Sequence, residues 1–382
     1  MKNFSYHNPT RIEFGIGKEE NIGRYIVGSG ISKVLIVYGS ERIRHNGLFN
    51  KAAKSLTDSG ISFESLGGVQ SNPLLSKVYE GIAIAKAKGM EAVLAIGGGS
   101  VLDSSKAIAA GATYEGDVWD FFTYKAVPDK ALKIFDIMTL AATGSEMNNF
   151  AVVTKDETKE KFSLAGAATY PTVSVINPAL QATVGNDYLA YSAADIFAHS
   201  LDMYLSATYL PEYIAGYVEN ILKTVMRTTE ILLIDSDNYE ARAEFAWAAT
   251  QALNFTTFCG VENNRYDTHF LEHTLSAEYN IAHGAGLSIL MPAWMKWQKQ
   301  FLPERFDRFA KNMFNAEGAD AGIEALKDWY VKIGTPVTLK EGKIPEEDIP
   351  VLVDKLSVIA GMMGTTELYT RDMIRIVLEN AL

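Results

Sequence analysis

The most constraining feature of the sequence is the alternation, in its first half, of short apolar runs with segments of helical spacing. The segments 46–59 and 76–88 have the spacing of amphipathic helices and lie between such runs. Short strands that are apolar on both faces suit a parallel sheet covered by helices on both sides. The alternation therefore predicts a doubly wound, Rossmann-like α/β domain. The strand-like runs are Val34–Tyr38, Ile61–Glu64, Ala92–Ile96, Phe135–Leu140 and Val173–Ile176.

The second half of the chain has a different composition. After Pro178, alanine, leucine and glutamate become frequent, and helical spacing continues to Leu382. A chain of 382 residues also exceeds the size of one ordinary core. We therefore expect an α/β domain over residues 1–180 and an all-helical domain over residues 181–382. The predicted helices include Tyr188–Leu205, Ile214–Asp235, Ala241–Phe258 and Tyr266–Tyr279.

Composition excludes several classes of protein. The net charge of −11, with no basic stripe, argues against binding to nucleic acid. Cys259 is the only cysteine, so an internal disulfide is impossible and a thiolate metal cage is not expected. The N-terminus lacks the apolar core of a signal peptide, and no apolar run reaches the roughly 18 residues of a membrane span. The sequence thus predicts a cytoplasmic protein with no membrane partner.

A glycine-rich turn, Gly97-Gly98-Gly99-Ser100, separates a predicted strand from a predicted helix. Glycines there let backbone amides approach a pyrophosphate, whose charge the helix N-terminus stabilises. The motif is not the GxGxxG fingerprint, and an ordinary tight turn is the alternative. The strand–turn–helix context favours phosphate binding.

A second polar turn, Thr139–Glu146, follows the predicted strand at 135–140. Its hydroxyl groups and Gly144 could line a cofactor or could simply close a loop. The residues alone do not decide between these two interpretations.

Four of the six histidines fall between positions 199 and 283. Asp195 and His199 are four residues apart, as are His269 and His273, so each pair shares one face of a predicted helix. His283 follows at a predicted helix break. Such a cluster can hold one cation.

The donor set of one carboxylate and several imidazoles, without a thiolate, suits Fe(II), Zn(II), Mn(II) or Ni(II). The alternative is that isolated histidines cap helices or satisfy polar groups in the core. We accept that alternative for His7 and His45, which have no such neighbours. The two paired spacings favour a metal site for the remaining four.

The residues around these motifs resemble the iron-containing (group III) alcohol dehydrogenases, especially the butanol dehydrogenase-like and aldehyde reductase branch. The resemblance covers nearly the whole chain. Its most specific part reads H-F-L-E-H-T-L-S-A-E-Y-N-I-A-H-G-A-G-L from His269 onward. The other matching parts are Asn8–Gly15, Gly97–Asp103, Thr139–Glu146, Asp195–His199 and Trp247–Ala252.

The resemblance implies a set of metal ligands. In the family an aspartate, a histidine four residues later and two histidines fourteen residues apart hold the ion; here these are Asp195, His199, His269 and His283. Fe²⁺ is the metal that the family leads us to expect first. His273 would lie beside the substrate, and we expect it to relay a proton. A role in orienting a ligand is the alternative.

The resemblance also implies cofactor-binding residues. Gly97, Gly98, Gly99, Ser100 and Asp103 would hold the pyrophosphate and its surroundings. Thr139, Thr143 and Lys161 would approach the nicotinamide side.

The turn that would face the adenine ribose departs from the branch pattern, since the chain reads Gly39-Ser40-Glu41-Arg42. Gly39 replaces an aspartate found in some NAD-specific relatives, and Arg42 could pair with a 2′-phosphate. Glu41 could instead bind a free 2′-hydroxyl. We expect both cofactors to be used, with a modest preference for NADP(H).

Together these features predict a metal-dependent, NAD(P)-linked alcohol dehydrogenase or aldehyde reductase that acts on small, butanol-like substrates. Hydride transfer with a Lewis-acid metal is the expected chemistry, and the family implies a homodimer. One alternative is an enzyme of the dehydroquinate synthase or glycerol dehydrogenase type with a more polar substrate. The others are a cofactor-free metal hydrolase and a non-catalytic metal-binding protein.

Overall fold

The computed structural model covers residues 1–382 and divides into two compact units. The α/β unit comprises His7–Val184 and Ser236–Asn254, and the helical unit comprises Met1–Tyr6, Gly185–Asp235 and Phe255–Leu382. This division differs from a single boundary after residue 180, because residues 236–254 group with the α/β unit. The helix in that segment is tied to the unit by a buried hydrogen bond from Thr250 Oγ1 to the Glu146 carboxylate.

The α/β unit is built on a six-stranded sheet in which every neighbouring pair of strands is parallel. Its central strands are buried on both faces, as their uninterrupted apolar sequences predict. In spatial order the strands are β1 (Arg11–Phe14), β8 (Val173–Ile176), β5 (Lys133–Met138), β4 (Ala92–Gly97), β2 (Lys33–Tyr38) and β3 (Ser62–Leu66).

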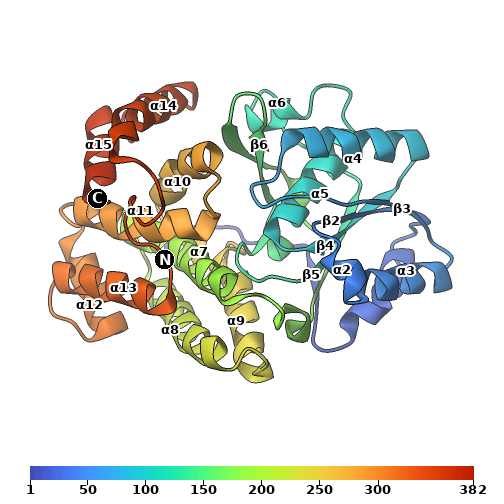
Figure 1. Ribbon diagram of the computed structural model, residues 1–382, viewed down its shortest axis with the longest axis horizontal. Coiled ribbons are helices and arrows are strands. Elements are labelled where there is room, and N and C mark those ends of the chain that lie inside the picture. Colours follow the sequence, from blue (N-terminus) through green and yellow to red (C-terminus); the bar gives the residue numbers. More distant parts are fainter. The chain divides into compact units, whose positions relative to one another are not determined.

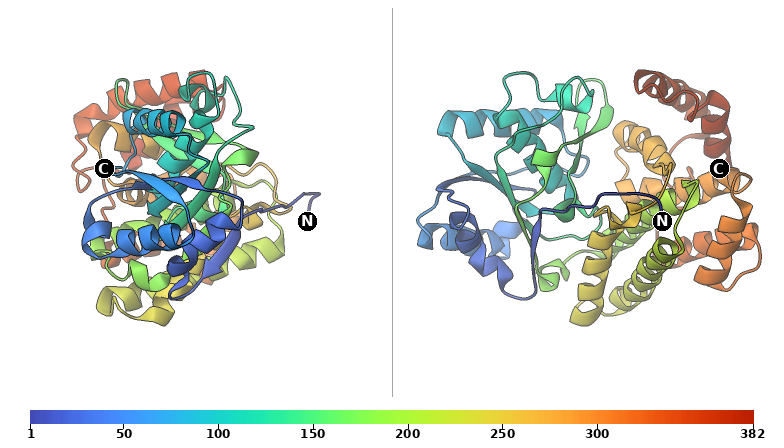
Figure 2. Two further views of the ribbon diagram at one scale, coloured as in Figure 1. Left: turned by 90° about the vertical axis from the view of Figure 1, so that its right-hand side faces the viewer. Right: turned by 180° about the vertical axis from the view of Figure 1, so that it is seen from behind.

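Helices cover both faces of this sheet (Figure 1), and the left view of Figure 2 shows the two helical layers with the strands between them. Alternate residues of the strands, such as Ile36 and Leu94, form one apolar core with α1 and α3. On the other face, α5 packs directly on β4 and β5. The helices of the unit are α1 (Ile22–Val27), α2 (Arg42–His45), α3 (Leu48–Asp58), α4 (Leu75–Lys88), α5 (Gly99–Ala112), α6 (Trp119–Phe122) and α9 (Tyr239–Ala252).

A small antiparallel hairpin completes the unit and packs against α5. The hairpin was not expected from the sequence. Its strands are β6 (Phe150–Lys155) and β7 (Glu160–Ala165), and the short 3₁₀ helices of the unit are η1 (Lys18–Asn21), η2 (Ser145–Met147), η3 (Ala167–Thr169) and η4 (Pro178–Gln181).

The helical unit is organised around α7 and α11, whose residues are apolar and buried on nearly every side. α7 packs against α8 and α11, and α11 also contacts α10, α13 and α15. The helices are α7 (Asn186–Ser206), α8 (Glu212–Ile234), α10 (Asp267–Tyr279), α11 (His283–Gln298), α12 (Pro303–Phe314), α13 (Ala319–Ile333), α14 (Ile349–Met362) and α15 (Arg371–Asn380), with η5 (Thr256–Phe258) and η6 (Glu346–Asp348) between them.

The start of α11 approaches α7 very closely at Gly284. A Cβ atom at Gly284 would lie 1.9 Å from the backbone carbonyl oxygen of Tyr191, so no other residue fits without moving the backbone. The glycine therefore allows His283, its neighbour in the chain, to reach the part of α7 that carries Asp195 and His199.

The predicted fold class is confirmed: a doubly wound parallel α/β unit is accompanied by a helical one. One predicted element was wrong, since the helix expected over Ala241–Phe258 ends at Ala252. Phe255 has a φ of +70°, a left-handed conformation that an α-helix cannot include. No helix in the structure combines the length and the apolar composition that crossing a membrane would need.

We predict that Gly284→Ala destabilises the helical unit by about 1–3 kcal/mol, because overpacking forces the α7 backbone aside. The melting temperature of the Gly284→Ala protein and its affinity for a divalent metal should both fall. The matched control is Gly216→Ala on α8, where an added Cβ meets no atom within 4 Å and a slight stabilisation is expected. Wild-type melting and metal binding in Gly284→Ala would show that the close approach imposes no constraint.

Candidate active site

The candidate metal site begins on the buried face of α7. Asp195 and His199 are one helical turn apart and are 3% and 5% exposed. The His199 Nε2 atom lies 3.5 Å from Asp195 Oδ1. The spacing of these two residues in the sequence therefore does place both side chains on one face, as predicted.

Two further imidazoles reach the same carboxylate oxygen from other helices. His269 on α10 and His283 at the first position of α11 each place Nε2 3.7 Å from Asp195 Oδ1. In a tetrahedral site with metal–nitrogen bonds of about 2.0–2.1 Å, neighbouring ligand atoms are about 3.4 Å apart. Each imidazole thus lies at nearly the separation from Asp195 that one ion requires. Asp195, His199 and His269 also have ligand atoms that all lie within 4.8 Å of one another, whereas His283 groups in this way with Glu272 and His273.

The donor atoms also lack other partners. Asp195 Oδ1 and His269 Nε2 are buried and make no hydrogen bond within the protein. An unpaired buried polar atom is costly, whereas coordination of a cation would satisfy both atoms. The donor set and these unpaired atoms fit a divalent metal ion.

Two buried carboxylates orient the imidazoles from behind. Asp202 Oδ2 lies 2.8 Å from His269 Nδ1, and the Asp202 carboxylate also accepts hydrogen bonds from the backbone amide and hydroxyl of Thr268. Glu272 forms a short contact with His283 Nδ1. Such bonds fix the ring and its tautomer, and they would leave Nε2 available to bind an ion.

The pKa values reflect this concentration of buried charge. Burial lowers the pKa of His199 to about 3, although Asp195 opposes the shift. For His269, burial also acts to lower the pKa, but the carboxylates of Asp195 and Asp202 outweigh it and raise the pKa to about 9. For Asp195, burial acts to raise the pKa, but the nearby imidazoles outweigh it and hold the pKa below its usual range. A metal ion bound by His269 would therefore compete with a proton for this imidazole.

The sequence prediction missed Asp202 and Glu272. Asp202 lies seven residues after Asp195, and Glu272 lies three after His269, so both share a face with a predicted ligand. That spacing was a usable signal, but exposed helix faces carry carboxylates at the same spacing.

His273 lies one turn beyond His269 and is half-buried. Its ring centroid is 5.7 Å from that of His283, and it forms a compact cluster with His283 and Glu272. The structure thus places His273 beside the predicted ligands, where both a proton relay and an orienting role are sterically open.

The glycine-rich turn joins β4 to α5, as predicted. Gly98 is the extended residue before the helix, and α5 begins at Gly99, so the first amides of a 14-residue helix point out of its N-terminus. The backbone amide of Thr139 donates to Gly97 O at 2.9 Å. A Cβ atom at Gly99 would lie 2.5 Å from Thr143 Cγ2. The two predicted cofactor segments are therefore in direct contact.

Other predicted cofactor residues are engaged within the α/β unit. The Asp103 carboxylate accepts hydrogen bonds from Ser145 Oγ and the Val152 amide. Lys161 Nζ donates to Asn72 Oδ1 at 3.0 Å. Both side chains therefore fix local loops.

The predicted ribose turn, Gly39–Arg42, follows β2 directly. Glu41 accepts a hydrogen bond from the Tyr38 hydroxyl at 2.9 Å and pairs with Arg44 at 3.2 Å. The Arg42 guanidinium donates to the Thr183 carbonyl. Glu41 and Arg42, the two side chains that could distinguish NADP from NAD at the ribose 2′ position, thus already have partners within the protein.

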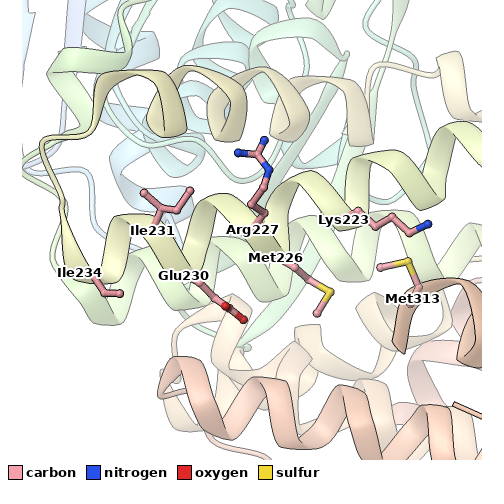
Figure 3. A pocket seen from close by; sticks show the side chains of 7 residues that line it. All are labelled: Lys223, Met226, Arg227, Glu230, Ile231, Ile234 and Met313. Carbon is pink, nitrogen blue, oxygen red and sulfur yellow. The ribbon is translucent and has the colours of Figure 1, made fainter. Parts of the chain in front are cut away.

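Figure 3 shows a surface pocket of about 540 Å³ between α8 and α12 in the helical unit. None of the predicted cofactor, metal or catalytic residues contributes to it. We therefore assign no part of the reaction to this pocket. Its lining is Lys223, Met226, Arg227, Glu230, Ile231, Ile234 and Met313.

Comparison with known proteins gives a consistent picture. Residues 9–178 match the family described as iron-containing alcohol dehydrogenase, and residues 189–382 match the C-terminal domain of the Fe-containing alcohol dehydrogenase family. The chain is 37% identical to a probable NADH-dependent butanol dehydrogenase of Bacillus subtilis, with 93% of each chain aligned. It is 30% identical to the NADPH-dependent aldehyde reductase YqhD of Escherichia coli, again with 93% of each aligned.

A solved structure agrees with these relatives. The crystal structure of an NADH-dependent butanol dehydrogenase A from Thermotoga maritima superposes with a TM-score of 0.97 at 45% identity, covering 100% of this chain and 99% of that one. The chain belongs to the iron-containing alcohol dehydrogenase family. It is accordingly a metal-dependent, NAD(P)-linked oxidoreductase of the alcohol dehydrogenase and aldehyde reductase type, as the sequence predicted.

We predict that Asp202→Asn lowers the affinity for a divalent metal by roughly 10–100-fold, because His269 loses the carboxylate that fixes its ring. Titration of metal-free protein with Zn²⁺ would measure the change. The matched control is Asp187→Asn, an exposed aspartate near the start of the same helix. Equal affinities in the two variants would contradict the orienting role of Asp202.

Proposed function

We propose that the protein interconverts small primary alcohols and the corresponding aldehydes, with butanol-like substrates as the preferred class. The observation that carries the proposal is the convergence of Asp195 Oδ1 with the Nε2 atoms of His199, His269 and His283. The names of the relatives at 30–37% identity support the substrate class.

A divalent metal bound there, with Fe²⁺ expected first, would polarise the substrate carbonyl or stabilise the alkoxide, and a bound nicotinamide would supply or accept the hydride. The protein contributes position and electrostatics. Asp195, His199, His269 and His283 are proposed as the ligands, and Asp202 and Glu272 hold two of the imidazole rings in place. The amides at the start of α5 are proposed to bind the cofactor pyrophosphate, since a helix N-terminus favours an anion.

Aldehyde reduction also requires that a proton reach the product oxygen. We assign this transfer to His273, which is half-buried and lies beside His283. An imidazole is suited to the task because its ordinary pKa lies near neutrality.

The surroundings of the ligands favour an apolar substrate. A row of aromatic rings leads to His269: Phe255 and Phe258 have centroids 5.4 Å apart, Phe258 and Tyr266 6.0 Å, and Tyr266 and His269 5.3 Å. Phe197, between Asp195 and His199 in the sequence, is fully buried and stacks on Trp329. The apolar character thus comes from the 255–266 segment.

A dehydroquinate synthase-like reaction would need cations for its anionic substrate. Arg265, the cation closest in sequence to His269, is held by both oxygens of the buried Asp267 carboxylate at 2.9–3.1 Å. This pairing favours the alcohol substrate over an anionic one. The family assignment removes the hydrolase and the non-catalytic alternatives.

We also propose that the protein acts in the cytoplasm and that it forms a homodimer, the second of which the family resemblance implies. Analytical ultracentrifugation of the purified protein would test the dimer.

The first test of the function is His269→Ala. We predict that this variant loses its bound metal and its turnover of butanal with NADH or NADPH, because the remaining ligands compete poorly for the ion. Binding of NADH should be retained, since the glycine-rich turn belongs to the α/β unit. Metal content, fluorescence titration with NADH and absorbance at the nicotinamide band would be measured. Full activity of metal-stripped wild-type protein would refute the proposed function.

The second test is His273→Ala. We predict that the metal is retained while turnover falls by about a hundredfold, the usual cost of a lost acid–base group. His45→Ala, at an exposed histidine of α2, is the control and should leave turnover unchanged. Metal loss as steep as the loss of activity would instead make His273 a ligand or its essential support.

Cofactor preference is the third test. Our prediction of a modest preference for NADP(H) rests on Gly39 and Arg42, whereas the relatives at 37% identity are named NADH-dependent enzymes. If Arg42 leaves Thr183 to pair with a 2′-phosphate, then Arg42→Ala should lower kcat/KM for NADPH and spare NADH. A preference for NADH that Glu41→Gly reverses would assign the discrimination to Glu41.

A further inference from the structure

Lys106 is a fully buried lysine in the middle of α5. Burying an ammonium group is costly unless its protons are hydrogen-bonded. Lys106 Nζ donates to the backbone carbonyls of Ser145 at 2.7 Å, Asn148 at 2.9 Å and Phe150 at 2.8 Å. It also contacts Ser145 Oγ at 2.7 Å. One side chain thus gathers three carbonyls of a single segment, residues 145–150.

Asp103, one turn earlier on α5, holds the same segment. Its carboxylate accepts from Ser145 Oγ at 2.9 Å and from the Val152 amide at 3.1 Å. Two consecutive turns of one helix therefore hold residues 145–152 from the same side. No apolar pair of side chains could replace these directional bonds.

The charges around Lys106 explain how the ammonium is tolerated. Burial lowers the pKa of Lys106 to about 8, while the carboxyl groups of Asp103, Asp136 and Glu146 oppose that shift. Burial raises the pKa of each of these three carboxyl groups. The Lys106 side chain therefore keeps its positive charge near neutral pH.

The held segment continues a cofactor segment. Residues 139–144 run from the end of β5 to Ser145, the first residue that Lys106 holds. The backbone amide of Thr139 donates a hydrogen bond to Gly97 O. Thr143 fills the space in front of Gly99. The N-terminus of α5 thus meets residues 139–143, and the middle of α5 fixes residues 145–150.

We propose that Lys106 is a positioning residue for the cofactor: by fixing residues 145–150 to α5, it sets the distance between the Thr139–Thr143 segment and the Gly97–Ser100 turn. The inference rests on the cofactor assignment made under the proposed function. It goes beyond that assignment because Lys106 is fully buried and makes its hydrogen bonds to residues 145–150 rather than to either cofactor segment.

A positioning role can be separated from a purely structural one. Removing one member of a buried charge cluster destabilises a protein unless the groups left behind become neutral. In Lys106→Met the neighbouring carboxyl groups, whose pKa values burial already raises, can take up protons and so limit the loss of stability, but three carbonyls remain without their common donor. The segment 139–150 would shift while the turn and helix α5 remain.

The test compares two ligands, NADH and ADP-ribose, which carries the pyrophosphate but no nicotinamide. In Lys106→Met we expect the Kd for NADH to rise by about tenfold or more, since misplacement on the order of 1 Å is costly. The Kd for ADP-ribose should stay close to that of the wild type. Lys86→Met is the matched control, because Lys86 is exposed and donates to only one carbonyl, that of Tyr114.

Equal increases in both Kd values, or no increase in either, would overturn the positioning role. Ser145→Ala provides a second variant if Lys106→Met fails to fold. It removes the hydroxyl that links Lys106 to Asp103 and should raise the Kd for NADH more than the Kd for ADP-ribose. An unchanged ratio of the two Kd values would again overturn the inference. Wild-type protein that binds neither ligand would instead refute the proposed function.

Discussion

Three imidazoles from α7, α10 and α11 converge on the carboxylate of Asp195, and their burial makes this convergence a constraint on the whole helical unit. Each charged or polar group in the cluster is tolerable only because its neighbours are correctly placed. α7 must present Asp195 and Asp202 on one face, and α10 must present His269 and Glu272 on another. The register of the central helices is thus fixed by polar chemistry as well as by apolar packing.

The α/β unit also contains a cluster of buried, hydrogen-bonded charges, but this cluster has a different role. Around Lys106, buried charges hold a loop to a helix, whereas around Asp195 they leave donor atoms facing one point. In both clusters the directional bonds select one arrangement from the several that an apolar core of equal volume would accept. Precise placement of loops and ligands is what hydride transfer requires of a protein.

Local periodicity predicted the parallel sheet, the helical second half and the shared helix face of Asp195 and His199. The full set of four converging side chains was implied by the family resemblance. The sequence did not predict Lys106 as a buried residue, since lysine at helical spacing is normally exposed. The helix end at Ala252 was also missed, because the left-handed Phe255 has no local sequence signal. The role of Asp202 depended on knowing which helix faces are buried, and that is a tertiary property.

The inclusion of α9 in the α/β unit has a consequence for synthesis of the protein. The last strand of the sheet ends at Ile176, but the unit also includes residues 236–254, which the ribosome adds later. At about 5–20 residues per second, the 70 residues from Val184 to Asn254 take roughly 4–14 s to translate. During that interval Glu146 lacks Thr250, its buried partner, and the 3₁₀ helices η2 and η4 lack the helix that packs on them. The α/β unit can therefore be completed only after residues 185–235 of the helical unit have been synthesised.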